Sequence, residues 1–322
     1  MHIYPYLLQA LSPLHAGTGQ SAGIIDLPIA RMRATGIPFV PGSSIKGVLR
    51  DARRRDNLAT DTLYAVFGPD RAQSGSADDG PGRNSDTPES IDHAGALIVG
   101  DARLLALPVR SFRGAFALVS SPLLLHLARR DLVEAGLEPP SRLNAFAPGR
   151  PAARVIIGNA VNVYSPADPD RADARVYLDD LDLPVEHHPS VNKWADFIAD
   201  ALPEDERSII AQRLVIVDDD TMSYLWQTAT QVDTRVRIGD SGVVEDGALW
   251  TEESLPPESL LIGLMAAHAS LRKDAPLTAA EILDAAVPQA TRVLQFGGKS
   301  TVGRGRCGFH QFCAPAPAGE KS

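Results

Sequence analysis

The stretch LSPLHAGTGQSAGIIDLPIARMRATGIPFVPGSSIKGVLRDARRR (residues 11–55) combines glycine turns, one isolated carboxylate and a strongly basic end. Its only acidic residues are Asp26 and Asp51. Its basic residues are Arg31, Arg33, Lys46, Arg50, Arg53, Arg54 and Arg55. The whole chain has 322 residues and a formal net charge of -9, so this positive charge is local. A polyanion is the expected partner of such a surface.

The second half of this stretch predicts a short strand followed by a helix. Residues 37–40 are apolar, and an apolar stripe at helical spacing begins a few residues later. We expect Ser43 or Ser44 to cap the helix and, with the first-turn N–H groups, to form an anion site. Lys46 and Arg50 are four residues apart, so they lie on one helix face and can reach the same run of phosphates.

A second basic segment, FGGKSTVGRGRCGF (residues 296–309), lies near the end of the chain. It contains Lys299, Arg304 and Arg306 and no acidic residue. Glycines keep side chains away from the backbone, which suits the binding of a phosphate chain. A nucleotide-binding P-loop is excluded because the GxxxxGK[ST] spacing is absent. Tight turns that bind nothing are the alternative explanation of these glycines.

Composition limits the class of protein. A hydrophobic fraction of 44% over this length suffices for one large domain with insertions. The sequence has no membrane-spanning apolar run and no secretory leader, so we expect a cytoplasmic protein that does not bind membranes. Two cysteines, Cys307 and Cys313, are too few for a disulfide framework and wrongly spaced for a zinc knuckle.

Several segments are predicted from local pattern. Residues 68–95 are rich in Gly, Ser, Asp and Pro, which is typical of a mobile loop, and residues 139–190 predict an irregular, proline-rich insertion. Two strands, at 234–238 and 247–251, are separated by a glycine-containing turn and predict a hairpin. Further strands are predicted at 2–9, 96–99, 115–119, 154–157, 174–178, 214–217 and 260–266, and helices at 122–135, 192–202 and 279–289.

Four phrases in this order carry a resemblance to a known family: HAGTG (15–19), IDLPIAR (25–31), IPFVPGSSIKGVLR (37–50) and GGKSTVGRGR (297–306). The likeness extends through GDAR (100–103), SFRG (111–114), DDD (218–220) and EDGALW (245–250). The chain resembles the RAMP superfamily of CRISPR proteins. Within that superfamily it is most similar to the repeating backbone subunits of type III-B (Cmr) RNA-targeting complexes.

This resemblance implies a single domain over residues 1–322 in the α+β class. Its core would be ferredoxin-like and RRM-type, with inserted loops and a thumb β-hairpin at residues 235–255. Such subunits stack into a filament along crRNA, in contact with copies of themselves and with other subunits of the Cmr complex. Each thumb wedges into the duplex of crRNA and target RNA, so that the target is cut at regular intervals. Val243, Leu249 and Trp250 could supply the wedge, since inserted apolar side chains unstack bases. Packing of Trp250 at the hairpin base is the alternative for that residue.

Asp26 matches the catalytic aspartate of the family, which makes the expected activity an RNA-guided endoribonuclease. Cleavage by a neighbouring 2′-OH needs alignment, proton transfer and charge neutralisation, for which a divalent metal, Mg²⁺ or Mn²⁺, is expected. One carboxylate can hold such an ion only together with RNA oxygens and water. His15 is expected to hold RNA or order its loop, with acid–base catalysis as the alternative. The residues expected to bind RNA are His15, Gly17, Ser43, Ser44, Lys46, Arg50, Lys299, Thr301, Arg304 and Arg306.

Two other functions are compatible with the same sequence. A noncatalytic scaffold of a related type III complex would bind crRNA without cutting. A CRISPR precursor-RNA processing endoribonuclease would act as a single subunit on repeat RNA. Cleavage assays on target RNA and on repeat RNA distinguish the three.

Overall fold

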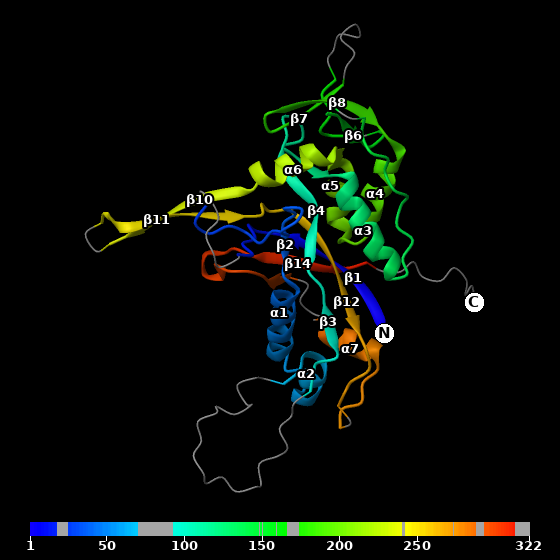
Figure 1. The fold of residues 1–322 in the computed structure, drawn as a ribbon, viewed down its shortest axis with the longest axis vertical. Coiled ribbons are helices and arrows are strands. Elements are labelled where there is room, and N and C mark those ends of the chain that lie inside the picture. The colour runs from blue at the N-terminus through cyan, green and yellow to red at the C-terminus, as the bar shows by residue number, and fades with distance from the viewer. Residues whose placement is uncertain are drawn as a thin grey trace.

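The computed structural model describes residues 1–17, 25–69, 93–147, 149, 151–158, 160–165, 174–239, 242–272, 274–287 and 293–312. These residues form a twelve-stranded mixed sheet with helices packed around it and a separate two-stranded hairpin (Figure 1). The α+β class predicted from the sequence is therefore confirmed. Among the described residues, no helix has the length and apolar character needed to cross a membrane.

The path through the large sheet is β13-β14-β1-β12-β4-β5-β9-β6-β8-β7, with β2 paired to β4 and β3 paired to β12. The strands are β1 (His2–Ala10), β2 (Phe39–Val40), β3 (Leu97–Val99), β4 (Ala102–Arg110), β5 (Phe116–Ser120), β6 (Ala153–Val155), β7 (Arg175–Leu178), β8 (Leu181–His187), β9 (Leu214–Val217), β12 (Leu260–Ala267), β13 (Val293–Gln295) and β14 (Arg306–Gln311). Most neighbouring pairs are antiparallel, whereas β5 with β9 and β6 with β8 are parallel.

Strand β1 lies between β12 and β14 and is buried on both faces. Successive side chains of a strand point to opposite faces, so Tyr6 and Leu8 enter one core while Leu7 enters the other. All three side chains are fully buried. A strand that is apolar on both faces needs cover on both, and the helices provide it.

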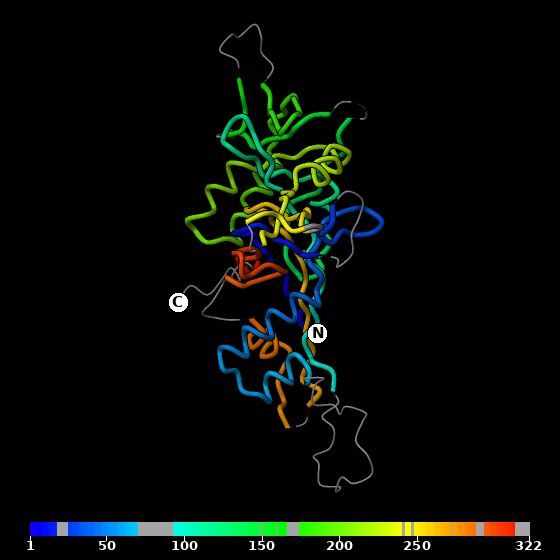
Figure 2. The backbone as a smooth tube through the Cα atoms, turned by 90° about the vertical axis from the view of Figure 1, so that its left-hand side faces the viewer, coloured from blue at the N-terminus to red at the C-terminus, as the bar shows by residue number. Residues whose placement is uncertain are grey.

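Seven α-helices are present in the described part of the chain. They are α1 (Gly42–Arg55), α2 (Thr60–Phe67), α3 (Pro122–Glu134), α4 (Pro189–Ala199), α5 (Glu204–Arg213), α6 (Asp219–Thr228) and α7 (Ala279–Ala286). Helices α1, α2, α6 and α7 contribute to the core that holds Tyr6, and α4 and α5 to the core that holds Leu7. The molecule is elongated, with α1, α2 and α7 toward one end (Figures 1 and 2).

The start of α1 differs from the prediction. Pro41 is the N-cap, and the backbone N–H of Gly42 donates to Asp101 Oδ1 at 2.8 Å. Ser43 and Ser44 are exposed and make no capping hydrogen bond, so the predicted serine cap is wrong. A distant residue fills this position because the helix start packs directly on the β3–β4 turn. A Cβ on Gly42 would lie 2.3 Å from the Val99 carbonyl oxygen.

The segment predicted as irregular over residues 139–190 contains both strands predicted within it, as β6 and β7, and also β8, which was not predicted. Strands β6, β7 and β8 extend one end of the large sheet. Strand β8 contains Pro184, which locally favours a loop, but its partners β6 and β7 come from other parts of the segment and supply the ladder. Helix α5 was not predicted. Its first turn holds Glu204, Asp205 and Glu206, which stabilise a helix N-terminus through its dipole.

Two polar segments have different outcomes. The acidic run at 218–220 begins α6: the Asp218 side chain accepts from the Thr221 N–H at 2.8 Å and from its hydroxyl at 2.6 Å. Most of the predicted mobile loop at 68–95, namely residues 70–92, lies outside the described residues.

The predicted hairpin is confirmed with longer strands, β10 (Gln231–Ile238) and β11 (Val244–Ser254), paired antiparallel with a register shift near Val236. Figure 1 shows that it projects from the body of the molecule. The part of β11 next to the body, residues 250–254, is called the β11 root below.

Candidate catalytic carboxylate and nucleic-acid interface

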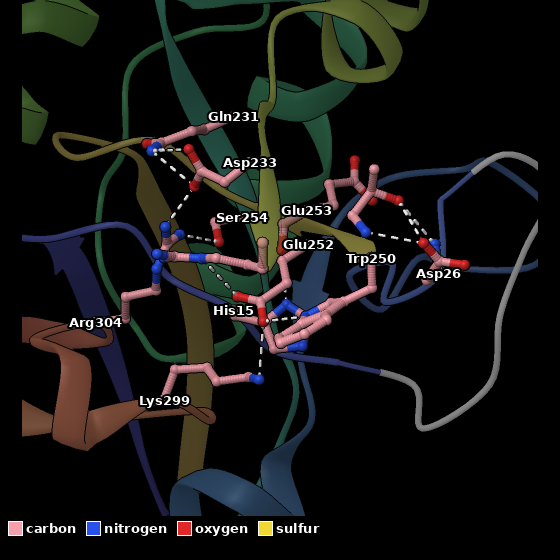
Figure 3. A network of polar contacts seen from close by, with 12 residues as sticks. His15, Asp26, Gln231, Asp233, Trp250, Glu252, Glu253, Ser254, Lys299 and Arg304 are labelled. Carbon is pink, nitrogen blue, oxygen red and sulfur yellow. Dashed lines mark hydrogen bonds and ion pairs between the residues drawn. The ribbon is translucent and has the colours of Figure 1, made fainter. Parts of the chain in front are cut away.

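Asp26 lies beside the β11 root and is bonded to it. The Leu27 N–H donates to the Thr251 carbonyl at 3.1 Å, and the Glu253 N–H donates to the Leu27 carbonyl at 2.9 Å. Asp26 Oδ2 accepts from the Thr251 backbone N–H at 2.8 Å and from the Thr251 hydroxyl at 3.0 Å (Figure 3). The carboxylate is exposed, although its segment is fixed.

These hydrogen bonds favour the ionised form of Asp26. The backbone N–H of Thr251, followed by its hydroxyl, stabilises the ionised form and lowers the pKa of the carboxyl below its ordinary value. Both hydrogen bonds from Thr251 go to Oδ2. An exposed carboxylate with a lowered pKa suits the binding of a cation or the orientation of a hydroxyl better than it suits proton abstraction.

The β11 root continues with two carboxylates on opposite faces of the strand, as the alternation of a strand requires. Glu252 is 2% exposed, and its Oε1 accepts from Lys299 Nζ at 2.8 Å and from the Trp250 indole at 2.7 Å. Arg235 on β10 lies 3.5 Å from Oε2. Burial raises the pKa of Glu252, but the hydrogen bonds from Lys299 and Trp250 outweigh it, so the pKa lies below its ordinary value. Glu252 therefore fastens the C-terminal loop to the hairpin.

Glu253, also 2% exposed, fastens the Asp26 segment to the same strand. Its Oε1 forms an ion pair with Arg31 and accepts from the Thr230 hydroxyl at 2.8 Å. Its Oε2 accepts from the Ile29 N–H at 3.1 Å. Three residues after Asp26 the chain is therefore held by a buried carboxylate, which limits how far the catalytic candidate can move.

His15 is buried against this assembly. Its Nδ1 lies 2.6 Å from the Glu253 carbonyl oxygen, and it must donate there because a carbonyl only accepts. A Cβ on Gly17 would lie 2.6 Å from His15 Nε2, and one on Gly297 would lie 2.2 Å from the His15 carbonyl oxygen. These two glycines therefore allow close packing around His15. The geometry gives His15 and Gly17 roles in ordering the loop, and RNA contact by either stays a prediction.

The C-terminal glycine-rich loop is only partly open to a ligand. Arg304 is 6% exposed: its Nη1 donates to Ser254 Oγ at 2.9 Å and its Nη2 forms an ion pair with Asp233 (Figure 3). Lys299 bonds to Glu252. By contrast, Thr301 and the Arg306 side chain are exposed. The structure thus gives Arg304 a bracing role at the hairpin base and leaves Thr301 and Arg306 as the accessible RNA-binding candidates of this loop.

The two basic residues of α1 each contact a backbone carbonyl. Lys46 Nζ donates to Leu97 O at 2.7 Å, and Arg50 Nη2 donates to Gly68 O at 2.9 Å. Both side chains are half-buried. Desolvation, followed by the nearby charge of Arg50, lowers the pKa of Lys46. Both contacts are with the protein itself, and the role of the two residues as RNA contacts stays a prediction.

The three wedge candidates of the hairpin separate into two groups. Val243 and Leu249 are 65% and 63% exposed, and Leu249 pairs across the strands with the exposed Val236. Trp250 faces the opposite side from Leu249, is half-buried, and lies under Lys299, whose Nζ is 5.9 Å from the ring centroid. Trp250 thus packs at the hairpin base, whereas Val243 and Leu249 are available to a ligand.

The residues around Asp26 could hold a divalent ion only if water and RNA supplied most of its ligands. Within the described ranges, no three His, Cys, Asp or Glu side chains are grouped so that they could hold a metal. The two nearest carboxylates along β11, Glu252 and Glu253, are buried and engaged. Asp26 can therefore offer one oxygen to a hydrated cation whose other ligands are water and RNA, in keeping with the coordination habits of Mg²⁺.

Sequence reasoning missed the residues that position the site: Thr251, Glu252, Glu253, Asp233 and Ser254. The adjacent pair Glu252-Glu253, directly after the predicted strand at 247–251, was an available signal. If the strand continues, alternation sends one of the two carboxylates to each face, and each then needs a cation. The cations that pair with Glu252 and Glu253 could not be identified from the sequence, since Lys299 and Arg31 come from opposite ends of the chain.

The chain is similar to known proteins over almost its whole length. The family model of the RAMP superfamily matches residues 7–308. The CRISPR system Cmr endoribonuclease Cmr4 of Pyrococcus furiosus is 28% identical over 309 residues, covering 95% of this chain and 94% of the relative. The CRISPR system CMR subunit Cmr4 of Saccharolobus solfataricus is 26% identical over 324 residues, covering 94% of each.

Solved structures share the fold. The crystal structure of oligomeric Cmr4 from Pyrococcus furiosus superposes with a TM-score of 0.67 at 24% identity, covering 97% of this chain and 98% of that one. A chain of the type III-B Cmr-beta complex bound to cognate target RNA gives a TM-score of 0.67 at 20% identity, covering 97% and 98%. Because the family model spans nearly the whole described fold, this chain belongs to the RAMP superfamily.

Proposed function

We propose that the chain is a repeating backbone subunit of a type III-B Cmr particle, which binds crRNA and cuts complementary target RNA at regular intervals. The observation that carries the proposal is the direct bonding of the exposed Asp26 carboxylate to Thr251, at the base of the projecting hairpin. The relative named as a Cmr endoribonuclease, which aligns over nearly all of this chain, supports it.

The hairpin supplies the surface that opens the duplex. Val236 opposite Leu249 and Ile238 opposite Val244 form two exposed cross-strand apolar pairs. Apolar side chains inserted between base steps unstack them and kink the duplex, at a cost of about a few kcal/mol per step. A nucleotide displaced in this way presents its 2′-OH and phosphate in an arrangement that a stacked helix forbids.

Asp26 then acts on the displaced linkage. Its ionised oxygen orients the attacking 2′-OH or a water. Because the hydrogen bonds to Thr251 hold the carboxylate in place, the attacking group stays aligned with the phosphate, and this alignment lowers the activation barrier of cleavage. A divalent cation such as Mg²⁺ or Mn²⁺, held by Asp26 together with water and RNA oxygens, would neutralise the charge that develops on the phosphate. The proposed cytoplasmic particle also contains crRNA, further copies of this chain and other Cmr subunits.

The RNA path follows from the exposed candidates. Thr301 and Arg306 on the C-terminal loop and the α1 face with Ser43, Lys46 and Arg50 are proposed to hold the crRNA backbone. Contacts of this kind position RNA without reading its sequence, as a guide-binding subunit requires.

Cleavage mapping tests the proposal. The chain is assembled with the other Cmr subunits and a crRNA of known sequence, then given an end-labelled complementary target with Mg²⁺, with Mn²⁺ or with chelator. We expect a regular ladder of cuts that depends on complementarity and on the metal. Target binding without cuts under every metal condition would support the scaffold, and cutting of repeat RNA by the isolated chain would support the processing enzyme.

A further inference from the structure

A pocket lined by aromatic and acidic side chains lies outside the site described above. It has a volume of about 580 Å³ and is lined by Arg110, Phe112, Tyr164, Tyr177, Asp179 and Asp180. These residues come from the end of β4, from β7 and from the segments that flank them, toward the end of the molecule opposite α2 (Figure 1). None of them contacts Asp26 or the β11 root.

Three rings build one wall of this aromatic pocket. Phe112 meets Tyr164 and Tyr177 at centroid distances of 6.4 and 6.0 Å with interplanar angles of 73° and 74°. Tyr164 and Tyr177 meet at 6.1 Å and 65°. Each ring thus contacts the other two edge to face, an arrangement favoured by the ring quadrupoles. Phe112 is nevertheless 75% exposed, a large apolar surface for an isolated subunit.

Backbone hydrogen bonds hold the wall in place before any ligand arrives. The Phe112 N–H donates to Tyr177 O at 3.3 Å, and Tyr164 exchanges two backbone hydrogen bonds with Arg175, at 2.8 and 2.9 Å. The Asp179 N–H donates to Arg110 O at 2.9 Å. A preformed pocket avoids the ordering cost that weakens binding.

The charge of the pocket favours a cation. The Asp179 and Asp180 side chains are exposed and form no ion pair or hydrogen bond with the described residues. Arg175, the nearest basic residue on β7, is engaged by Asp182, with Nε 2.7 Å from Oδ1. Among the described lining residues Arg110 is the only basic one, so these residues together carry one net negative charge, to which the negative ring faces add. An RNA phosphate entering this pocket would meet two carboxylates.

We propose that the aromatic pocket binds the guanidinium of an arginine side chain presented by a neighbouring protein subunit. A guanidinium is planar, so it can stack on Phe112 or a tyrosine ring while its N–H groups donate to Asp179 and Asp180. At an exposed site neither the stacking nor the hydrogen bonds to the carboxylates are strong alone. A single guanidinium can make both at the same time, because its N–H groups lie in the plane of the group and its faces stay free to stack. The chemistry of the ligand is independent of the proposed function, whereas the identity of the partner as another subunit of the same particle rests on it.

A titration with a small probe tests the chemistry. The full chain is labelled with 3-fluorotyrosine and titrated with N-acetyl-arginine amide while ¹⁹F resonances are followed. N-acetyl-citrulline amide, a neutral isostere, and guanosine monophosphate are the comparison probes. We expect saturable shifts of the Tyr164 and Tyr177 resonances, assigned with Tyr→Phe variants, for the arginine probe alone. The absence of saturable shifts, equal affinity for citrulline amide or tighter binding of the nucleotide would overturn the proposal.

Variants locate the binding groups. Phe112→Ala, and the double variant Asp179→Asn with Asp180→Asn, should each weaken the arginine probe by about fivefold. Asp205→Asn, an exposed acidic residue of α5, is the matched control and should bind like the wild type. All these side chains are exposed, so the fold should persist, and circular dichroism checks it. Undiminished binding in the Phe112 and Asp179/Asp180 variants would place the probe elsewhere and refute the assignment.

Cross-linking in the assembled particle identifies the occupant. With p-azidophenylalanine in place of Phe112, irradiation should join this chain to a protein subunit, and mass spectrometry should find the joined peptide near an arginine. Cross-links to RNA alone would contradict the proposal. Since the probe titration needs neither RNA nor other subunits, a failure of RNA cutting in the particle would leave its result intact.

Discussion

Thr251 donates two hydrogen bonds to Asp26, one from its backbone N–H at 2.8 Å and one from its hydroxyl at 3.0 Å. The residues are 225 positions apart in the sequence, yet this contact joins the exposed carboxylate to the base of the hairpin. A displacement of the β11 root on RNA binding must therefore move Asp26 with it. The position of the proposed catalytic group is therefore coupled to the position of the hairpin that carries the proposed wedge.

Replacing Thr251 by Val should remove both hydrogen bonds of the hydroxyl with Asp26, the one it donates to Oδ2 and the one it accepts from the Asp26 N–H at 3.1 Å. The backbone hydrogen bond and the side-chain shape are kept. The pKa of Asp26 is held down by Thr251, so it should rise in this variant. If the ionised carboxylate acts in cleavage, as proposed, the acid limb of the cleavage profile should move to higher pH. At neutral pH the carboxyl stays ionised in both proteins, so cutting there should fall only through the loss of the hydroxyl that positions it. Thr251→Ser keeps the hydroxyl and should retain the wild-type profile. If the acid limb of the Val variant is not shifted, the Thr251 hydroxyl does not lower the pKa of Asp26.

Removal of Glu253 should destabilise the fold. Glu253→Ala would leave the partly buried Arg31, the Thr230 hydroxyl and the Ile29 N–H without their shared acceptor. Breaking a buried ion pair costs about 3–5 kcal/mol, and because Arg31 is partly exposed we expect about 2–3 kcal/mol of the free energy of unfolding, measured in urea.

The matched control is Glu245→Gln, which removes an exposed carboxylate 3.9 Å from Arg237 on the outer hairpin. Exposed pairs contribute about 0–1 kcal/mol, so the control should unfold close to wild type. Equal stability of the Glu253 and Glu245 variants would show that the β11 root does not hold the Asp26 segment as described.

The two arginines of the C-terminal loop should behave differently. Arg306→Gln removes an exposed charge and should weaken RNA binding, reducing the slope of log affinity against log salt by about 0.7 to 0.9. Arg304→Gln removes the brace to Asp233 and Ser254, so its first effect should be a lower free energy of unfolding. Filter binding over a salt series and urea unfolding measure both. An unchanged salt slope in the Arg306 variant would exclude it from the RNA path.

A polar substitution of Leu249 should impair cutting without affecting the fold. Leu249→Ser changes a side chain that is 63% exposed, so unfolding should shift by less than about 0.5 kcal/mol. Loss of the apolar wedge should reduce target cleavage while crRNA assembly persists. Val232→Ser, at the base of the same hairpin, is the control and should cut normally. If both variants cut at the wild-type rate, the apolar pairs have no role in opening the duplex.

Local patterns predicted the elements whose cause is local. The opening strand, the helix after Pro41, the helix from Pro122 and the hairpin all follow from periodicity and turn residues, and the structure contains each of them. The cap of α1 could not be predicted in this way, because Asp101 reaches Gly42 only after the sheet has formed. Strand β8 likewise was not predicted, because it depends on its partner β6, which lies far from it along the chain.

The candidate site shows the same division. Asp26 was predicted from the family motif and is exposed as that role needs. Arg304 was predicted to bind RNA from its glycine-rich surroundings, but it is buried with Asp233, since a charge pattern does not show which basic residues are already neutralised by the fold. Nothing in the sequence pointed to Thr251, because this uncharged strand residue becomes a hydrogen-bond donor to Asp26 only through a long-range contact of the folded chain.

The cleavage assay on Asp26→Asn tests the account most directly. The substitution keeps the size of the side chain and its capacity to accept from Thr251 but removes the charge, and Asp51→Asn in the same basic stretch is the matched control. In particles assembled with crRNA, the account predicts wild-type affinity for target RNA and loss of the regular cuts in the Asp26 variant alone. Cutting by the Asp26→Asn particle at the wild-type rate and positions would contradict it.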